Sequence, residues 1–104
     1  MVHNASTENE QAGRAAFALC ADDYGLSPAV SEGILKLLEK GRLTATGAMT
    51  NRPAWRTMAG ALKPYEGKVD LGLHLNLTCG APLGSMPRVA GGGALPPLGR
   101  LARA

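Results

Sequence analysis

The amino-acid sequence predicts an α/β fold in which parallel strands alternate with helices. Two segments have strand patterns, the apolar run at 15–21 and the alternating stretch at 69–78, and two helical patterns begin between them, at Ser27 and Pro53. A short strand pattern at 43–49 separates the helices, which gives a βαβαβ order with right-handed crossovers. The chain has 104 residues, whereas a closed (β/α)₈ barrel needs about 200 to 250. If the pattern belongs to such a barrel, this sequence holds only part of it.

The first strand and the first helix have clear boundaries in the sequence. The apolar run at 15–21 predicts a buried strand that ends at the turn-like residues 22–25. Ser27 can cap the helix, Pro28 fits its first turn because the missing N–H costs nothing there, and Gly41 is the natural residue after its last turn. The predicted apolar face of this helix consists of Val30, Ile34, Leu37 and Leu38.

The second strand and the second helix are predicted from shorter patterns. Residues 43–49 alternate weakly between Gly41 and Asn51, which favours a strand. Pro53 then opens a helical pattern that Lys63 and Pro64 close. The apolar residues of this second helix are Trp55, Met58, Ala59 and Leu62.

The third strand, predicted over 69–78, has one apolar face and one polar face. The apolar positions are Val69, Leu71, Leu73, Leu75 and Leu77, and the polar ones are Asp70, Gly72, His74, Asn76 and Thr78. In a parallel sheet that helices cover on both sides, both faces are apolar. A polar face therefore indicates a lumen or cleft in which these side chains meet a ligand.

Composition divides the chain into three parts. Residues 1–14 form a polar leader that we expect to be disordered, 15–83 form the folded part, and 84–104 form a Gly/Pro-rich loop with a helix start near Leu98. The leader lacks the pattern of a secretory signal, and no apolar run approaches the roughly 18 residues that a membrane span needs. We therefore expect a cytoplasmic protein without a membrane span.

The charge distribution argues against nucleic-acid binding. Eleven Lys and Arg against eight Asp and Glu give a net charge of +3. Arg88, Arg100 and Arg103 in the C-terminal part account for this excess, so the rest of the chain is nearly neutral. Nucleic-acid interfaces need basic residues clustered on one face. We expect no nucleic-acid partner.

Three polar residues stand where an α/β fold places ligands. Asp22 and Asp23 follow the first strand, and ligands bind at the carboxyl ends of parallel strands. His74 lies near the same end of the third strand. An aspartate and a histidine from different strands could hold Mg²⁺, Mn²⁺ or Zn²⁺ with water in the open position. The alternatives are a solvated turn for the acidic pair and a packed strand residue for His74.

Two further residues have alternative interpretations. Cys20, two residues before Asp22, could join a zinc site, although packing as a small apolar residue is more common for cysteine. Asn51 follows the second strand and is either a helix cap or a group that hydrogen-bonds the substrate.

Three sequence motifs resemble a known family. ADDYGLS at 21–27, GILKLLEKGRLTATGAMTN at 33–51 and GLHLNLT at 72–78 resemble the YdjC-like carbohydrate deacetylases, which include chitooligosaccharide deacetylases and members associated with hopanoid biosynthesis. The resemblance covers about 17–104. It implies a (β/α) barrel related to polysaccharide deacetylases, of which 15–83 is a truncated N-terminal part with the order βαβαβ. It also implies hydrolysis of N-acetyl groups from amino sugars at a divalent metal.

The resemblance assigns roles to five residues. Asp23 and His74 would be metal ligands, Asp22 the general base, and Asn51 and Asn76 would line the sugar pocket. Mg²⁺ is the expected ion, with Zn²⁺ or Mn²⁺ as alternatives. The family carries a further metal-binding histidine downstream, in a D-x-H-x-H motif that this sequence does not contain. We therefore expect these 104 residues to be inactive alone.

A second hypothesis is a small α/β interaction module without catalytic activity. A partial sheet would expose its strand edges and the leucines of the third strand, which favours homo-oligomers. A cooperative, metal-free monomer would favour this module, whereas a self-associating chain would favour the incomplete barrel.

Overall fold

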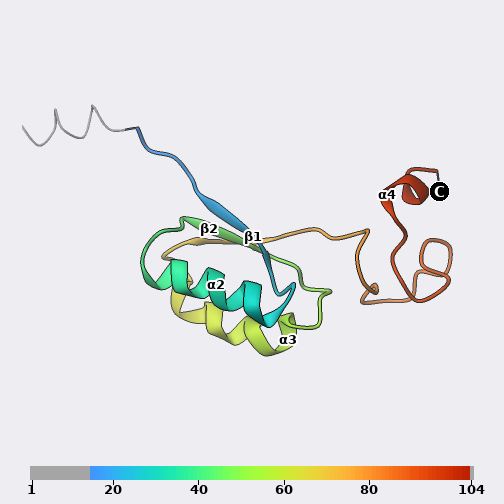
Figure 1. Cartoon of the computed structure of the whole chain (residues 1–104), viewed down its shortest axis with the longest axis horizontal. Helices are drawn as coiled ribbons and strands as arrows, with labels where there is room; N and C mark the ends of the chain where they lie inside the picture. The colour runs from blue at the N-terminus through green and yellow to red at the C-terminus, as the bar shows by residue number, and fades with distance from the viewer. Residues whose placement is uncertain (1–14, 104) are drawn as a thin grey trace, which may run out of the picture.

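The computed structural model describes residues 15–103, so the predicted leader at 1–14 lies outside the described residues. Its centre is a three-stranded parallel sheet in the order β1-β2-β3 (Figure 1). The elements are β1 (Cys20–Tyr24), α2 (Pro28–Glu39), β2 (Ala45–Ala48), α3 (Trp55–Met58), the 3₁₀ helix η1 (Ala59–Tyr65), β3 (Asp70–Leu73) and α4 (Leu98–Leu101). The small parallel α/β sheet that the sequence predicts is confirmed.

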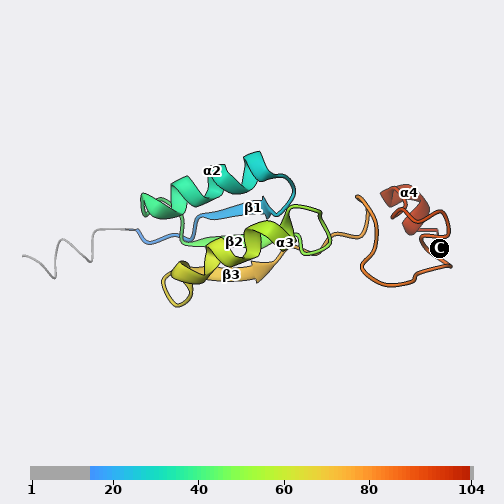
Figure 2. The same ribbon diagram turned by 90° about the horizontal axis from the view of Figure 1, so that it is seen from below.

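The helices that connect the strands lie on one face of the sheet. Figures 1 and 2 show α2 beside α3 and η1 on the same side of the sheet, and no described helix covers the opposite face. The core lies between the sheet and these helices, and its buried residues are Tyr24, Ile34, Leu38, Leu43, Ala48 and Leu62. The segment after β3 continues past the carboxyl ends of the strands toward α4 (Figure 1).

Helix α2 has the ends that the sequence predicts. The Ser27 side chain accepts a hydrogen bond from the Val30 N–H at 3.2 Å, and Pro28 is the first helical residue. At the other end, Gly41 adopts φ 65°, its N–H donates to Leu38 O, and the next N–H donates to Leu37 O. These two bonds form a Schellman motif. Of the predicted apolar face, Ile34 and Leu38 are buried, whereas Val30 and Leu37 stay more than a third exposed.

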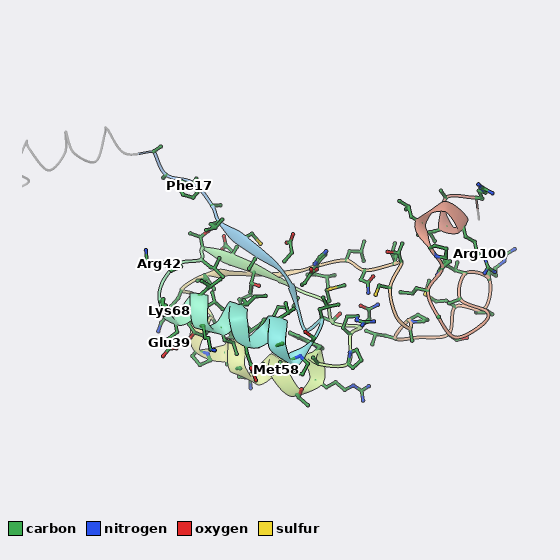
Figure 3. All side chains as sticks on the ribbon, in the orientation of Figure 1. Phe17, Glu39, Arg42, Met58, Lys68 and Arg100 are labelled. Carbon is green, nitrogen blue, oxygen red and sulfur yellow. The ribbon has the colours of Figure 1, made fainter. Side chains whose placement is uncertain are left out.

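The first strand begins later than predicted and runs through the acidic pair. Residues 15–19 lie outside the sheet, and Phe17 is 77% exposed (Figure 3). The predicted buried strand at 15–21 is therefore wrong for its first five residues. The reason is that β2 pairs only from Ala45 onward, so nothing lies beside the chain before Leu19. The turn predicted at 22–25 is also displaced, because β1 continues to Tyr24.

The second helix and the third strand are both shorter than predicted. Only α3 is α-helical, and η1 continues as a 3₁₀ helix. An α-helix cannot run on through Pro64, because its ring clashes with the carbonyl four residues earlier. Strand β3 ends at Leu73 because its partner β2 ends at Ala48, whose carbonyl accepts the His74 N–H at 2.9 Å. Asn76 consequently lies in the loop after the strand.

The apolar face predicted for the third strand is not buried. Its leucines are between 38% and 68% exposed, and these residues are Leu71, Leu73, Leu75 and Leu77.

Among residues 15–103, no helix is long and apolar enough to cross a membrane.

Candidate metal centre

A β-bulge shapes the end of β1. Ala21 pairs with Thr46, and Tyr24 pairs with Ala48. Two residues therefore lie between these pairs in β1 and one residue lies between them in β2, which defines a bulge. The extra residue is accommodated at Asp23, where φ is 71°, the one positive value at a non-glycine residue in the described part of the chain. Aspartate is among the few residue types that tolerate this conformation.

The bulge places both carboxylates away from the core. Ala21 and Tyr24 both contact the core beneath the sheet, which they could not do at a spacing of three in a regular strand. Asp22 lies instead in a hollow on the uncovered face, beside Gly47 and His74. The turn of this segment spans 23–26, and it is solvated only in part, because Tyr24 is fully buried while the two carboxylates are exposed.

Asp23 and His74 are in direct contact. Asp23 Oδ1 lies 3.1 Å from His74 Nδ1, and the Asp23 backbone N–H donates to the same nitrogen at 3.2 Å. The two side chains are 44% and 34% exposed, respectively, so both are accessible from solvent. The structure therefore brings together two of the residues that the sequence selects, although 51 positions separate them.

This contact has a definite electrostatic requirement. A nitrogen that accepts a backbone N–H presents a lone pair, and a carboxylate oxygen also presents lone pairs. Two such atoms at 3.1 Å repel each other unless a proton or a cation lies between them. Two ligands that each lie about 2.1 Å from one ion at a right angle are about 3 Å apart. The pair can therefore chelate a divalent cation once the Asp23 N–H gives up the single lone pair of Nδ1 to the ion. Its chemistry, one oxygen and one imidazole nitrogen, suits Mg²⁺, Mn²⁺ and Zn²⁺.

The pair is an incomplete ligand set within the described residues. Residues 15–103 contain no group of three or more His, Cys, Asp or Glu side chains that could hold a metal ion. Cys20 does not add a ligand to Asp23 and His74: its sulfur approaches Asp22 Oδ1 at 3.9 Å. Cys20 is exposed, so its interpretation as a buried apolar residue is wrong, because it faces the uncovered side of the sheet.

Asn51 and Asn76 lie side by side at the same end of the sheet. Asn76 Nδ2 donates to Asn51 Oδ1 at 3.1 Å and to Cys79 O at 2.7 Å, and Asn76 Oδ1 accepts from the backbone N–H groups of Thr78 and Cys79. The Asn76 amide thus organises its own loop. Asn51 does not cap a helix, since the N-cap of α3 is Ala54.

An open pocket of about 270 Å³ adjoins the Asp23–His74 pair. His74, Asn51 and Asn76 line one part of it, and apolar residues that include Leu75 and Leu83 line the rest. A few polar groups in a mostly apolar wall are typical of small-molecule sites. The pocket places the two asparagines within reach of a molecule that contacts His74.

Gly47 leaves room for His74. A Cβ built at Gly47 would lie 3.2 Å from His74 Cβ, closer than ordinary packing allows. Neither Gly47 nor the bulge at Asp23 produces a pattern in the sequence that identifies it. The single hint is that a glycine within a strand often marks the close approach of another group.

Gly47→Ala is expected to displace the His74 ring and to weaken Mn²⁺ binding by about three- to tenfold, because ligands tolerate only about 0.5 Å of misplacement. The free energy of unfolding should change by less than about 1 kcal/mol. Gly72→Ala is the matched control, since Gly72 pairs with Gly47 and a Cβ there meets nothing within 4 Å. Titration of both variants with Mn²⁺ checks this, and equal affinities would contradict the steric role of Gly47.

Comparison with known proteins identifies the family. A family model described as YdjC-like protein matches residues 16–103. The chain belongs to the YdjC-like family. This match confirms the family that the three sequence motifs predict.

Two curated relatives of this YdjC-like chain are described as deacetylases. A carbohydrate deacetylase from Halalkalibacterium halodurans is 43% identical over 63 residues, which are 61% of this chain and 26% of that protein. A chitooligosaccharide deacetylase from Serratia marcescens is 39% identical over 67 residues, which are 64% of this chain and 26% of that protein. The chain thus spans about a quarter of the length of these relatives.

A solved structure has a similar fold. It is a protein from Enterococcus faecalis whose name refers to cellobiose-phosphate cleavage. The TM-score is 0.70 at 24% identity, and the match covers 83% of this chain and 35% of that one. At this identity the likeness concerns the fold alone.

Proposed function

We propose that this chain supplies part of the active site of a metal-dependent carbohydrate deacetylase, which hydrolyses N-acetyl groups of amino sugars. The observation that carries the proposal is the 3.1 Å contact between Asp23 Oδ1 and His74 Nδ1. Two electron-rich atoms held this close, at the carboxyl end of a parallel sheet, form half of a chelating site. Membership of the YdjC-like family and the deacetylase relatives support the same activity.

Asp23 and His74 are the proposed ligands, with Mg²⁺ the favoured ion and Mn²⁺ or Zn²⁺ as alternatives. When bound, the ion would polarise the acetamide carbonyl and make a water molecule more acidic. Without an ion, the Asp23 N–H donates to His74 Nδ1 and holds the imidazole beside the Asp23 carboxylate. An ion on Nδ1 would take the place of this N–H, because Nδ1 has a single lone pair. Further ligands would come from outside the described residues.

Asp22 is the proposed general base. Asp22 is exposed on the uncovered face of the sheet, where it lines the same hollow as His74 and stays accessible to water. It can therefore accept a proton from the water that attacks the acetyl group. We propose that Asn51 and Asn76 line the sugar pocket. Asn76 would hold the loop in place, and Asn51, whose Nδ2 already donates to Asn76 O at 3.3 Å, would present its second amide N–H to the substrate.

We also propose that the sheet is the N-terminal part of a (β/α) barrel. Within residues 15–103, the helices that connect the strands lie on one face of the sheet (Figure 2). The polar residues of the site lie at the other face, which would face the lumen. The similar fold of a chain more than twice as long supports this arrangement. The two cysteines are free, which is typical of a reducing compartment, so we propose the cytoplasm as the location.

A chimera tests the activity. Residues 16–82 of this chain would replace the corresponding N-terminal segment of the Serratia marcescens chitooligosaccharide deacetylase, and acetate release from an N-acetylated chitooligosaccharide would be measured. The chimera should be active, and Asp23→Asn or His74→Ala should reduce kcat/KM at least about a hundredfold, since even outer-shell ligand partners are worth about 10- to 100-fold. A folded chimera whose activity survives both substitutions would refute the assignment.

A second candidate is a small non-enzymatic α/β interaction module, for which the exposed leucines of β3 and its loop would be a contact surface. Leu73 and Leu75 are 66% and 68% exposed, and β3 is an edge strand of the described sheet. Light scattering with and without divalent ions separates the candidates. A cooperative monomer that is indifferent to ions would favour the module without metal chemistry.

A further inference from the structure

The peptide group between Tyr24 and Gly25 is held at both of its polar atoms. The Tyr24 carbonyl accepts the Met49 N–H at 2.7 Å, and the Gly25 N–H donates to Ser31 Oγ at 2.9 Å. The first bond comes from the segment after β2 and the second from α2. This peptide group therefore cannot rotate without breaking a hydrogen bond to one of two different elements.

This peptide group lies one residue beyond the strained residue of the bulge, Asp23. Asp23 has φ 71°, a conformation that a non-glycine residue keeps only when its surroundings impose it. The Leu26 N–H donates to Asp23 O at 3.0 Å, which closes the turn, and Gly25 itself adopts φ 92°. A Cβ at Gly25 would lie 3.1 Å from Met49 O, so this turn is packed as well as hydrogen-bonded.

Ser31 is the polar side chain of α2 that reaches this turn. It is 0% exposed, on the face of α2 that carries Ile34 and Leu38 into the core. A hydroxyl at such a position is unfavourable unless it is hydrogen-bonded, and Ser31 Oγ accepts a hydrogen bond from the Gly25 N–H. Alanine would pack equally well at position 31. The hydroxyl thus has a specific use, which is to hold the turn.

We propose that Ser31 is a positioning residue for the Asp23–His74 pair. It acts through the Gly25 peptide group, which fixes the conformation of Asp23 and so keeps both Oδ1 and the backbone N–H of Asp23 at His74 Nδ1. The part of this inference that concerns metal binding rests on the function proposed above. The part that concerns the Asp23 conformation stands on the hydrogen bonds alone.

Ser31→Ala tests the proposal in the 104-residue chain, with Ile34→Val as the matched control. Ile34 is buried one turn further along α2 and makes no hydrogen bond to the turn, so its truncation lowers stability without touching Asp23. The Asp23 amide should exchange with solvent at least about tenfold faster in Ser31→Ala than in Ile34→Val, the factor expected for one lost buried hydrogen bond. Broadening of the His74 ring signals by Mn²⁺ should require a correspondingly higher ion concentration.

Each outcome decides the proposal. Equal exchange of the Asp23 amide in the two variants overturns it, and so does faster exchange with an unchanged Mn²⁺ response. If Mn²⁺ does not broaden the His74 signals of the wild-type chain, the proposed metal function fails, while the exchange comparison still decides whether Ser31 controls Asp23. If Ser31→Ala does not fold, Ser31→Cys replaces it, because sulfur accepts a hydrogen bond only weakly.

Discussion

Asp23→Asn is expected to lower the affinity of the chain for Mn²⁺ at least about tenfold, since it removes the charge from one of two proposed ligands. Asparagine tolerates the positive φ of residue 23 nearly as well as aspartate, so the fold should be kept. His74→Ala should weaken binding by a similar factor. Electron paramagnetic resonance of free Mn²⁺ gives the affinities directly.

Asp70→Asn is the control for this experiment. Asp70 lines the same hollow on the uncovered face but stands at the opposite end of β3, beside Ala45. Its substitution removes the same charge from the same side of the sheet. Should Asp70→Asn weaken Mn²⁺ binding as much as Asp23→Asn does, the ion would be attracted by general charge and not held by the Asp23–His74 pair.

Tyr24→Ala is expected to cost about 3 to 5 kcal/mol of folding free energy, the range for removal of a buried aromatic side chain. Tyr24 is 0% exposed, its ring packs edge-on against Trp55 at 6.4 Å, and its hydroxyl donates to Met58 O at 2.6 Å. A loss of this size is comparable to the whole stability of a small domain. Urea denaturation should therefore find the variant largely unfolded.

Tyr24→Phe separates the hydroxyl from the ring. It should cost only about 1 kcal/mol, the usual value of one hydrogen bond. If Tyr24→Ala were no worse than Tyr24→Phe, the ring would not be part of the core that supports the bulge.

The pH dependence of stability provides a second measurement on Tyr24. Burial raises the pKa of its hydroxyl above the ordinary value of 10.0. The folded state therefore keeps the proton at a pH where the unfolded state releases it. Below pH 10.0 the Tyr24 hydroxyl does not make the free energy of unfolding depend on pH. Above pH 10.0 the free energy of unfolding falls as pH rises. Tyr24→Phe should lack that part of the decline, and parallel curves for the two proteins would contradict it.

Helix α2 could be predicted in detail because its signals are local. Ser27, Pro28 and Gly41 each act on backbone groups within a few residues, and the structure gives them those roles. The exposure of Val30 and Leu37 could not be predicted, since it depends on what other segments lie against the helix.

The strand boundaries could not be predicted from sequence patterns because a strand ends where its neighbour ends. The run at 15–21 and the alternation at 69–78 both extend beyond the sheet, and β2, only four residues long, limits the pairing on both sides. The short β2 has a weak pattern of its own. The length of β2 therefore could not be predicted from the sequence.

Part of the candidate site could be predicted from the sequence. Asp23 and His74 could be selected because polar residues at the ends of parallel strands meet at one edge. Their contact depends on a bulge in β1, on the absence of a side chain at Gly47 and on a buried hydroxyl at Ser31. None of these three features has a distinctive single-sequence pattern, because each is defined by a residue more than five positions away or on another strand.

The most direct test is pulsed electron paramagnetic resonance on Mn²⁺ added to the chain with ¹⁵N-labelled histidine. We expect a hyperfine coupling to one imidazole nitrogen that is lost in His74→Ala and in Asp23→Asn, and that is unchanged when His3, the other histidine, is replaced. Bound Mn²⁺ without such a coupling, or a coupling that survives both substitutions, would show that Asp23 and His74 do not share a metal ion.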